Sequence, residues 1–455
     1  MKKLIFLLFI IFMAFTSIVA YGHGELEKLK FTIYVPEDEV LLKSGFTNED
    51  KDIYVVTMKE EKLDVFKKYK FKLLIYDKNT GENKETRTME TKELAPHYSI
   101  EAKVHNKFKY MMVYKYLNRG TENEINIYDL KEFKLLKSIS INEENRERQS
   151  LIDFSGDGKY LIYPMEPRKK TFMEESNKIR LPRITDLVLY DLENMKVFKY
   201  ISMEEKLKSD PIQIENIILS DDGKIIFYDG VHLYYNNKKD YYTKSYYHVK
   251  KIIHVEKDLI RDVKINEKYG PFKSVDFIRD KNILSANFGV GNVSIYGFDL
   301  LDGSMKYNDT YKRSINSDWT LMTSALTVDK SKIIGLYSDK TLRILNSNRG
   351  KKISTMKLEK KTTLPIFVAT DELIFVPAFL KYGEDVSMPS EFYHVVDMKK
   401  GLVKYKINNK KIARILSISE NKEVVLSQEG IFWDNELSNN IYVWDISKLT
   451  NMKGE

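Results

Sequence analysis

The chain has 455 residues, of which 43% are hydrophobic and 12% aromatic. This composition excludes a disordered chain, and its aromatic content suits half-buried β-strands better than helices. A net charge of +8, spread over so long a chain, does not predict a nucleic-acid partner. The absence of cysteine excludes disulfides, thiol catalysis and lipid attachment through a cysteine.

Residues 1–22 are predicted to be a secretory signal peptide. Lys2 and Lys3 precede an apolar run, residues 4–15, that is too short for an ordinary membrane span, and small residues follow it. No other stretch approaches transmembrane length. We therefore expect a cleaved signal and a secreted or periplasmic mature chain, residues 23–455, that forms a single domain. An uncleaved N-terminal anchor is the alternative.

A short motif recurs along the mature chain, in which an apolar strand, a tight polar turn and a second apolar strand follow one another. The two clearest copies are FSGDGK from Phe154 and LSDDGK from Leu219. Asp tolerates left-handed backbone and Gly favours it, so two antiparallel strands can reverse tightly there. With weaker copies included, the motif starts at residues 46, 104, 154, 219, 277, 326, 368 and 418. A spacing of about fifty residues is typical of propeller blades.

A second motif follows each turn. It is an apolar strand that ends in an aromatic residue and Asp, or a similar pair, as in INIYDLKE (125–132), LVLYDLEN (187–194) and IYVWDISK (441–448). One more strand follows in most units, so each unit is predicted to hold four strands, a to d. The fourth unit lacks a clear motif for strand c, because the Tyr-rich residues 228–250 are hard to divide.

Together these motifs resemble a WD-repeat β-propeller. The turn FSGDGK resembles that family's Ser-Pro-Asp-Gly-Lys turn, with Gly156 where proline is usual, and Trp444-Asp445 matches its Trp-Asp pair. The resemblance covers nearly the whole mature chain. It implies an all-β fold, a β-propeller of four-stranded blades.

The two ends of the chain predict how the ring closes. The last unit ends soon after its strand c, whereas residues 28–36 are one strand too many for the first unit. We expect this N-terminal strand to complete the last blade, which holds Trp444, because closure removes unpaired sheet edges. This count gives eight blades, and seven is the alternative.

Binding residues are expected in the loops between strands b and c, all of which leave the same face of a propeller. The long ones are residues 164–186, 381–392 and 428–440, in units that lie near one another on a closed ring. Long loops on a rigid scaffold often carry function, and Arg and aromatic residues often dominate binding energy. The alternative is solvated insertions that pack on the blade below. The candidate binding residues are Arg168, Lys169, Lys170, Phe172, Arg180, Arg183, Tyr382, Phe432 and Trp433.

Residues 234–251 interleave Tyr and Lys, a pattern that could stack on sugars or bases. In a β protein we expect instead an exposed pair of strands, because Tyr is a favoured strand residue.

Catalytic motifs are missing. The chain has no His-Glu-x-x-His, no Gly-x-Ser-x-Gly and no Walker-type loop, and its GDG and DDG fragments lack the remaining ligands of a calcium loop. We predict no catalytic residue, metal site or cofactor. The favoured hypothesis is an exported, non-enzymatic propeller scaffold that binds another protein or a cell-envelope polymer through the b–c loops, without nucleic acid. The alternatives are a lyase or hydrolase that acts on a polysaccharide at the mouth of the central channel, and a small-ligand sensor that uses the channel.

Overall fold

The computed structural model describes parts of the chain between residues 28 and 448, and these are almost entirely β-strand. The described residues are 28–47, 50–63, 66–90, 97–105, 108–117, 123–141, 152–165, 186–201, 212–236, 241–265, 274–278, 283–288, 293–311, 321–327, 331–337, 341–358, 367–368, 373–382, 386–398, 402–407, 414–419, 421, 423–428 and 440–448.

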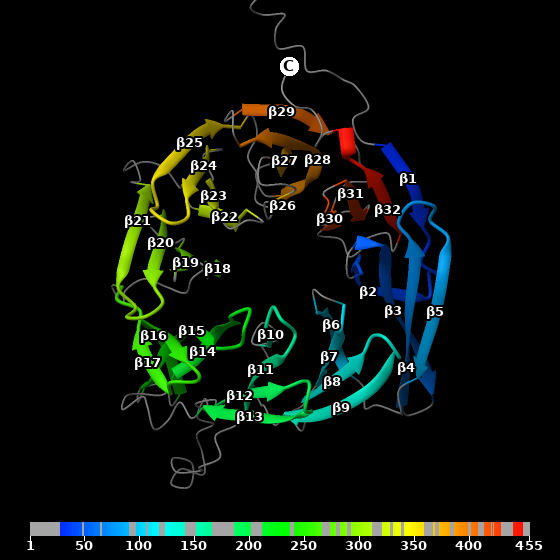
Figure 1. Ribbon diagram of the computed structural model, residues 1–455, viewed down its shortest axis with the longest axis horizontal. Coiled ribbons are helices and arrows are strands. Elements are labelled where there is room, and N and C mark those ends of the chain that lie inside the picture. Colours follow the sequence, from blue (N-terminus) through cyan, green and yellow to red (C-terminus); the bar gives the residue numbers. More distant parts are fainter. Residues whose placement is uncertain are drawn as a thin grey trace, which may run out of the picture.

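Within these residues the strands form eight four-stranded antiparallel sheets arranged around a central opening (Figure 1). We number the sheets as blades 1 to 8 in chain order and name their strands a to d from the centre outward. Blade 1 consists of β2 (Glu39–Phe46), β3 (Asp52–Leu63), β4 (Phe66–Asp77) and β5 (Asn83–Glu90), and blade 2 of β6 (His97–Val104), β7 (Tyr110–Leu117), β8 (Asn123–Asp129) and β9 (Lys134–Ile141). Blade 3 consists of β10 (Asp153–Phe154), β11 (Tyr160–Met165), β12 (Asp186–Asp191) and β13 (Lys196–Ile201), and blade 4 of β14 (Ile212–Leu219), β15 (Ile225–Asn236), β16 (Tyr241–His254) and β17 (Leu259–Asp262).

The remaining blades continue the same order until the last one. Blade 5 consists of β18 (Ser274–Ile278), β19 (Ile283–Phe288), β20 (Val293–Asp299) and β21 (Met305–Tyr311), and blade 6 of β22 (Leu321–Leu326), β23 (Lys332–Tyr337), β24 (Thr341–Asn346) and β25 (Lys352–Lys357). Blade 7 consists of β26 (Phe367–Val368), β27 (Leu373–Tyr382), β28 (Val386–Asp397) and β29 (Leu402–Ile407). Blade 8 takes β30 (Arg414–Ile418), β31 (Val424–Gln428) and β32 (Ile441–Asp445) from one end of the chain and β1 (Lys28–Ile33) from the other. The all-β propeller of four-stranded blades is therefore confirmed.

The turns between strands a and b explain the first sequence motif. In blade 3 the backbone N–H of Tyr160 donates a hydrogen bond to Ser155 Oγ at 2.9 Å, which closes the turn. Gly158 follows with φ of +73°, a backbone conformation that favours glycine. Equivalent hydroxyl-closed turns occur in four other blades, at Thr47, Ser220, Thr327 and Ser419. The GDG and DDG fragments are thus parts of turns.

The turns between strands c and d explain the second motif. Asp191 ends β12, and its Oδ1 accepts hydrogen bonds from the backbone N–H groups of Glu193 at 2.9 Å and Asn194 at 3.0 Å. A carboxylate or amide in this position mimics a backbone turn, so the strand stops there. The same role falls to Asp77, Asp129, Asp299, Asn346 and Asp445. Blade 4 has His254 at this position, which is why its strand c lacked a recognisable motif.

The core lies between the blades. Strands b and c are buried on both faces, as in β12, whose six residues are all buried, whereas strand d of blade 1 is mostly exposed. Every pair of neighbouring blades shares a cluster of buried aliphatic and aromatic side chains. The cluster between blades 8 and 1 joins Ile33, Val443 and Leu426 to Ile53 and Val55.

Strand β1 lies antiparallel to β32, the neighbour that the sequence predicts for it. Leu29 lies opposite Trp444 and Ile33 opposite Ile441, with a bulge between Leu29 and Phe31. A hydrogen bond also connects blade 8 to blade 1: the backbone N–H of Asn421, in the a–b turn of blade 8, donates to Oδ2 of Asp50, in the a–b turn of blade 1, at 2.9 Å.

One expectation for the connections is wrong and another is confirmed. Residues 381–392 were expected to form a loop, but β27 continues to Tyr382 and β28 starts at Val386, with these two residues paired. Most of that segment is therefore strand, since its valine and aromatic residues favour extended backbone. The Tyr-rich residues 234–251 do form a strand pair, as predicted, with Tyr235 opposite Tyr242.

Candidate functional site

The two faces of the propeller differ because antiparallel blades send their connections to fixed sides. The a–b and c–d turns all lie on one face, and those described are short and closed by their own hydrogen bonds. The b–c and d–a connections all leave from the opposite face, which we call the b–c face. Connections of varied length are therefore concentrated on the b–c face.

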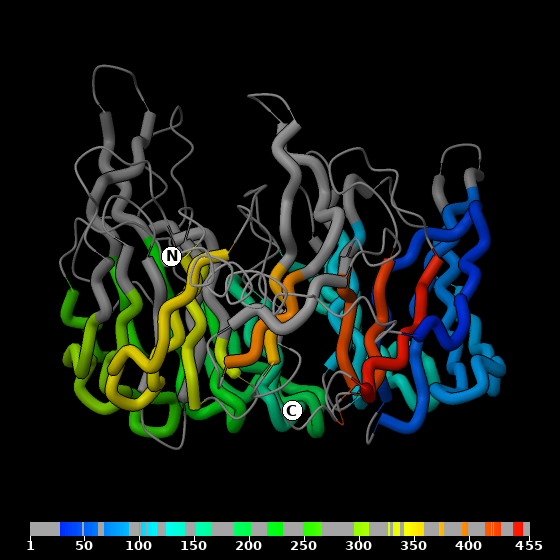
Figure 2. Tube along the Cα trace, turned by 90° about the horizontal axis from the view of Figure 1, so that it is seen from above, coloured from blue at the N-terminus to red at the C-terminus, as the bar shows by residue number. Residues whose placement is uncertain are grey.

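Three b–c hairpins are longer than the others. Strands β3 and β4 of blade 1 have 12 residues each, β15 and β16 of blade 4 have 12 and 14, and β27 and β28 of blade 7 have 10 and 12. In the other blades, strands b and c have five to eight residues. The hairpin of blade 1, drawn in blue, rises beyond the body of the propeller (Figure 2). We call these three pairs the extended hairpins.

Ion pairs stiffen the base of the blade 1 hairpin. Lys59 Nζ lies 2.7 Å from Asp38 Oδ2, and Lys68 Nζ lies 2.7 Å from Glu90 Oε2. The hydrogen bond to Lys59 lowers the pKa of Asp38, and the hydrogen bond to Glu90 raises the pKa of Lys68. These groups are largely exposed, so each pair adds little to stability.

Most of the binding residues predicted from the sequence fall outside the described residues. Those in 166–185 and 429–439 are Arg168, Lys169, Lys170, Phe172, Arg180, Arg183, Phe432 and Trp433. For Tyr382 only the backbone is described, at the end of β27 opposite Val386. Their part in binding stays a prediction.

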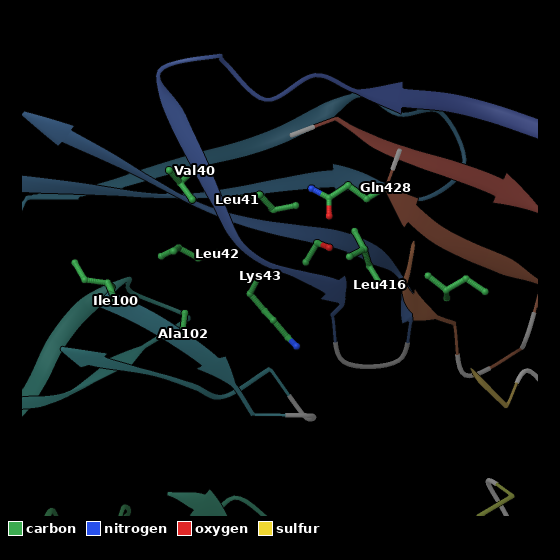
Figure 3. A pocket seen from close by; sticks show the side chains of 10 residues that line it. Val40, Leu41, Leu42, Lys43, Ile100, Ala102, Leu416 and Gln428 are labelled. Atoms are coloured by element: carbon green, nitrogen blue, oxygen red, sulfur yellow. The ribbon is translucent and has the colours of Figure 1, made fainter. Parts of the chain in front are cut away.

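A pocket of about 410 Å³ opens in the wall of the central channel (Figure 3). It lies where the innermost strands of three consecutive blades meet: β30 of blade 8, β2 of blade 1 and β6 of blade 2. We call it the inner pocket. The residues that line it are Val40, Leu41, Leu42, Lys43, Ser44, Ile100, Ala102, Ile415, Leu416 and Gln428.

Two β-bulges shape the inner pocket. The register between β2 and β3 shifts around Leu42, and the register between β30 and β31 shifts around Leu416. A bulge places one extra residue on its strand and turns the side chains that follow it. Both bulged leucines line the pocket, so consecutive residues of β2 can face the same space instead of alternating between faces.

The surface that lines the inner pocket is more polar than apolar, although most of the lining residues are aliphatic. Ser44 is only 5% exposed, and within the described part of the chain its hydroxyl has no hydrogen-bond partner. Leaving such a group unpaired costs about 1–3 kcal/mol. The amide of Gln428 is also buried, whereas Lys43 is exposed and extends toward the middle of the channel (Figure 3).

Glu39, which precedes Val40 of this pocket, has a carboxylate that is buried and already engaged. Thr57 Oγ1 donates a hydrogen bond to its Oε2 at 2.5 Å, and the ammonium of Lys72 bonds to its Oε1. This paired carboxylate contributes no free negative charge to the wall of the inner pocket.

The pKa shifts of the described carboxyl groups have the direction expected for groups in turns and ion pairs. Each one whose pKa is shifted has it lowered, as in Asp77 by Lys84 and by the turn backbone, or Glu132 by Lys134. A general acid needs the opposite shift. Among the described residues, no group of three or more His, Asp or Glu side chains could hold a metal ion.

The inner pocket and the extended hairpin of blade 1 were not predicted from the sequence, and that of blade 7 was predicted as a loop, whereas the strand pair of blade 4 was predicted. One signal for the pocket was present, since Val40, Leu41 and Leu42 are three apolar residues in succession in a strand expected to alternate. Such a break in the period of two is what a bulge produces. The convergence of β2, β6 and β30 carries no local sequence signal.

No helix within the described ranges is both long enough and apolar enough to cross a membrane. No protein-family model and no curated protein matches the sequence.

Comparison with solved structures does find similar folds. The computationally designed Ika8 protein has 10% sequence identity and a TM-score of 0.51, over 90% of this chain and 98% of that one. The C-terminal WD40 domain of Sif2 has 10% identity and a TM-score of 0.50, over 92% of this chain and 99% of that one. At this identity the likeness concerns the fold alone. With the recurring turns and the aromatic–Asp pairs, it establishes that the chain is a WD-repeat-like β-propeller.

Proposed function

We propose that this protein is an exported, non-enzymatic scaffold that binds another protein or a cell-envelope polymer through its b–c face. The observation that carries the proposal is the set of three extended hairpins on that face. The opposite face ends in tight turns that present little besides their own closed hydrogen bonds.

Strand pairing in the extended hairpins favours contact with a partner. Within the described residues, β17 pairs with β16 from Lys251 to His254, and the backbone N–H of Val263 donates to the carbonyl of Lys250, so residues 241–249 of β16 extend past the end of strand d. A strand edge of this kind can accept hydrogen bonds from a partner's backbone. The sequence of this hairpin is also rich in Tyr, which is common at the centres of interfaces.

The proposal includes the shape of the scaffold and the route of the protein. The eight sheets would be the complete set of blades and would close as one ring through β1. Residues 1–22 would be removed on export, with residues 23–455 as one domain. The mass of the mature protein purified from its native host would then correspond to a chain that begins at His23, and an intact Met1 would contradict cleavage.

Shortening the extended hairpins tests the binding face. Asn-Gly can replace residues 61–68, 233–246 and 379–391, because this pair closes a two-residue hairpin on the paired strands that remain. We expect the shortened chain to keep its far-ultraviolet circular dichroism and cooperative unfolding, and to lose the partners that the wild type recovers from envelope extract.

The matched control leaves the b–c face intact and alters the outer rim. Phe198 and Tyr200 are exposed on strand d of blade 3, and their replacement by Ser should leave recovery unchanged. If the folded, shortened chain recovered the same partners as the wild type, the b–c hairpins would not be the binding surface.

A further inference from the structure

We propose that the inner pocket binds an extended, uncharged polypeptide segment, which adds to the channel-facing edge of β6 through main-chain hydrogen bonds. The partner is a protein under the proposed function, on which this inference rests, and the segment is the part of that partner that enters the channel. The site lies in the wall of the channel and not on the extended hairpins, so the two surfaces can be tested separately.

Main-chain groups supply much of the polar surface of the inner pocket. Seven of its ten lining residues are aliphatic, yet the surface is more polar than apolar. The hydroxyl of Ser44 and the amide of Gln428 add little to it, because these side chains are only 5% and 4% exposed. The polar surface of the wall therefore belongs to the strand backbone and to Lys43.

The strands around the pocket each have one edge without a neighbour in their own sheet. β2, β6 and β30 lie at the inner ends of four-stranded sheets and pair on one side only (Figure 1). In an antiparallel strand, the main-chain N–H and C=O groups of successive residues are directed toward opposite edges. Every second residue of such a strand therefore directs these groups into the channel.

The turn after β6 determines which residues these are. The backbone N–H of His105 donates to the carbonyl of Tyr110 in β7 at 2.9 Å, so the N–H of His105 is directed toward β7. The register of β6 and β7 has no shift over residues 99–104. The directions therefore alternate along this part of β6, and the main-chain groups of Ile100 and Ala102, which both line the pocket, are directed into the channel (Figure 3).

Blade 4 shows the same alternation with its outward group occupied. The backbone N–H of Ser220 donates to the carbonyl of Ile225, so that of Leu219 is directed away from β15. It donates to Oδ2 of Asp153, on strand a of blade 3, at 3.2 Å. A side chain of a neighbouring blade thus takes up this outward donor, whereas within the described part of the chain no hydrogen bond occupies the outward groups of β6 in the inner pocket.

A row of unoccupied N–H and C=O groups matches the edge of another extended chain, which is how an added strand binds. Glu39 is paired with Lys72, and Lys43 has an interaction of its own, so neither is a free charge for a ligand to pair with. No lining residue is aromatic, so the pocket offers a sugar ring no face to stack on. The volume of about 410 Å³ is within the range of ligand sites. A short neutral segment with small aliphatic side chains fits all of these features.

Amide hydrogen exchange with a peptide probe tests the proposal directly. The probe is acetyl-Thr-Val-Thr-Val-Thr-Val-amide, N-methylated on alternate residues so that it keeps one pairing edge and cannot build a sheet with itself. We expect it to slow exchange at the N–H groups of Ile100 and Ala102 by about tenfold or more. Exchange at Glu101 and Lys103 should stay unchanged, because their N–H groups are directed toward β7. The same peptide N-methylated on every residue should have no effect.

A proline substitution tests the site from the side of the protein. Ala102→Pro removes the outward N–H without removing a hydrogen bond to β7, and an edge strand tolerates proline at such a position. It should weaken probe binding by about fivefold to tenfold, the effect of one lost hydrogen bond. Ala102→Ser keeps the N–H and is the matched control, which should bind the probe within about twofold of the wild type. Urea unfolding checks that both variants fold. If Ala102→Pro does not fold, the exchange pattern of the wild type decides.

Three results would overturn the assignment. They are unchanged exchange at Ile100 and Ala102 in the presence of the probe, equal binding of the probe and its fully N-methylated form, and saturable binding of a neutral saccharide, chitotetraose, in place of the probe. The chain with shortened hairpins keeps β6 and should bind the probe as the wild type does. Failure of the probe with hairpin-dependent partner recovery intact would overturn this site alone. Partner recovery that survives shortening, with the probe still bound, would overturn only the hairpin surface.

Discussion

At the scale of single residues, Asp191 shows how one side chain ends a strand and ties stability to pH. Burial raises the pKa of Asp191, but hydrogen bonds from the Asn194 side chain and from the backbone of Asn194 and Glu193 outweigh it, so the net pKa is below its ordinary value of 3.8. Asp299 and Asp445 are lowered in the same way, against the effect of burial. A carboxyl group with a lowered folded-state pKa stabilises the protein above its unfolded pKa. That contribution is lost as the pH falls through the folded-state value.

Asp191→Asn keeps an acceptor for the turn hydrogen bonds and removes the titrating carboxyl group. We expect it to keep most of the stability at neutral pH, because Asn346 fills the same position in blade 6 and accepts two backbone hydrogen bonds at 3.0 Å. It should also reduce the loss of unfolding free energy below about pH 4, since the titrating group is gone. Asp191→Ala should cost roughly 1–3 kcal/mol at neutral pH. Urea unfolding across a pH series measures both, and an Asn variant with unchanged acid sensitivity would rule out this role.

At the scale of elements, blade 4 contains a buried ion pair at the base of its extended hairpin. Asp229 on β15 lies directly opposite Lys250 on β16, with Nζ 3.4 Å from Oδ1 and side chains 0% and 1% exposed. Buried pairs seldom add net stability, because removing two charges from water offsets most of their attraction. A one-residue slip would separate the two charges, so we infer that the pair sets the register of β15 and β16.

Single and double replacements test this role. Asp229→Leu alone should destabilise the protein by roughly 3–5 kcal/mol, because it leaves a buried ammonium without its carboxylate. Asp229→Leu with Lys250→Met should recover most of that loss in urea unfolding, yet broaden the amide signals of the hairpin as alternative registers become accessible. A double variant as unstable as the single one would show that the pair is a net source of stability.

How far the sequence predicts the elements depends on whether their cause is local. The turns at Ser155 and Asp191 were recognisable because each is closed by side chains a few residues away. The extended hairpins of blades 1 and 7 were not, since the sequences of β3 and β28 carry no turn motif that closes through neighbouring side chains. Their strands follow from pairing with each other, which composition alone does not reveal.

At the scale of the whole molecule, the two ends of the chain meet in blade 8, where β1 pairs with β32. The sequence predicted that residues 28–36 lie beside Trp444 because one strand was missing from the last unit and one was spare at the start. The inner pocket, in contrast, was harder to predict, because the strands that line it come from blades 8, 1 and 2 and meet only in the fold. The pairing of β1 with β32 is the contact on which the proposed closed ring depends.

An engineered disulfide tests closure most directly, because the natural chain has no cysteine to compete. Lys28 lies opposite Asp445, and paired residues of antiparallel strands are about 4.5–5.5 Å apart, within reach of a disulfide. Lys28→Cys with Asp445→Cys should oxidise to a single monomeric species with linked 28 and 445 peptides. Lys28→Cys with Asp299→Cys, which removes the equivalent turn residue of blade 5, should remain reduced. Equal cross-linking in both pairs, or in neither, would contradict a propeller completed by its N-terminal strand.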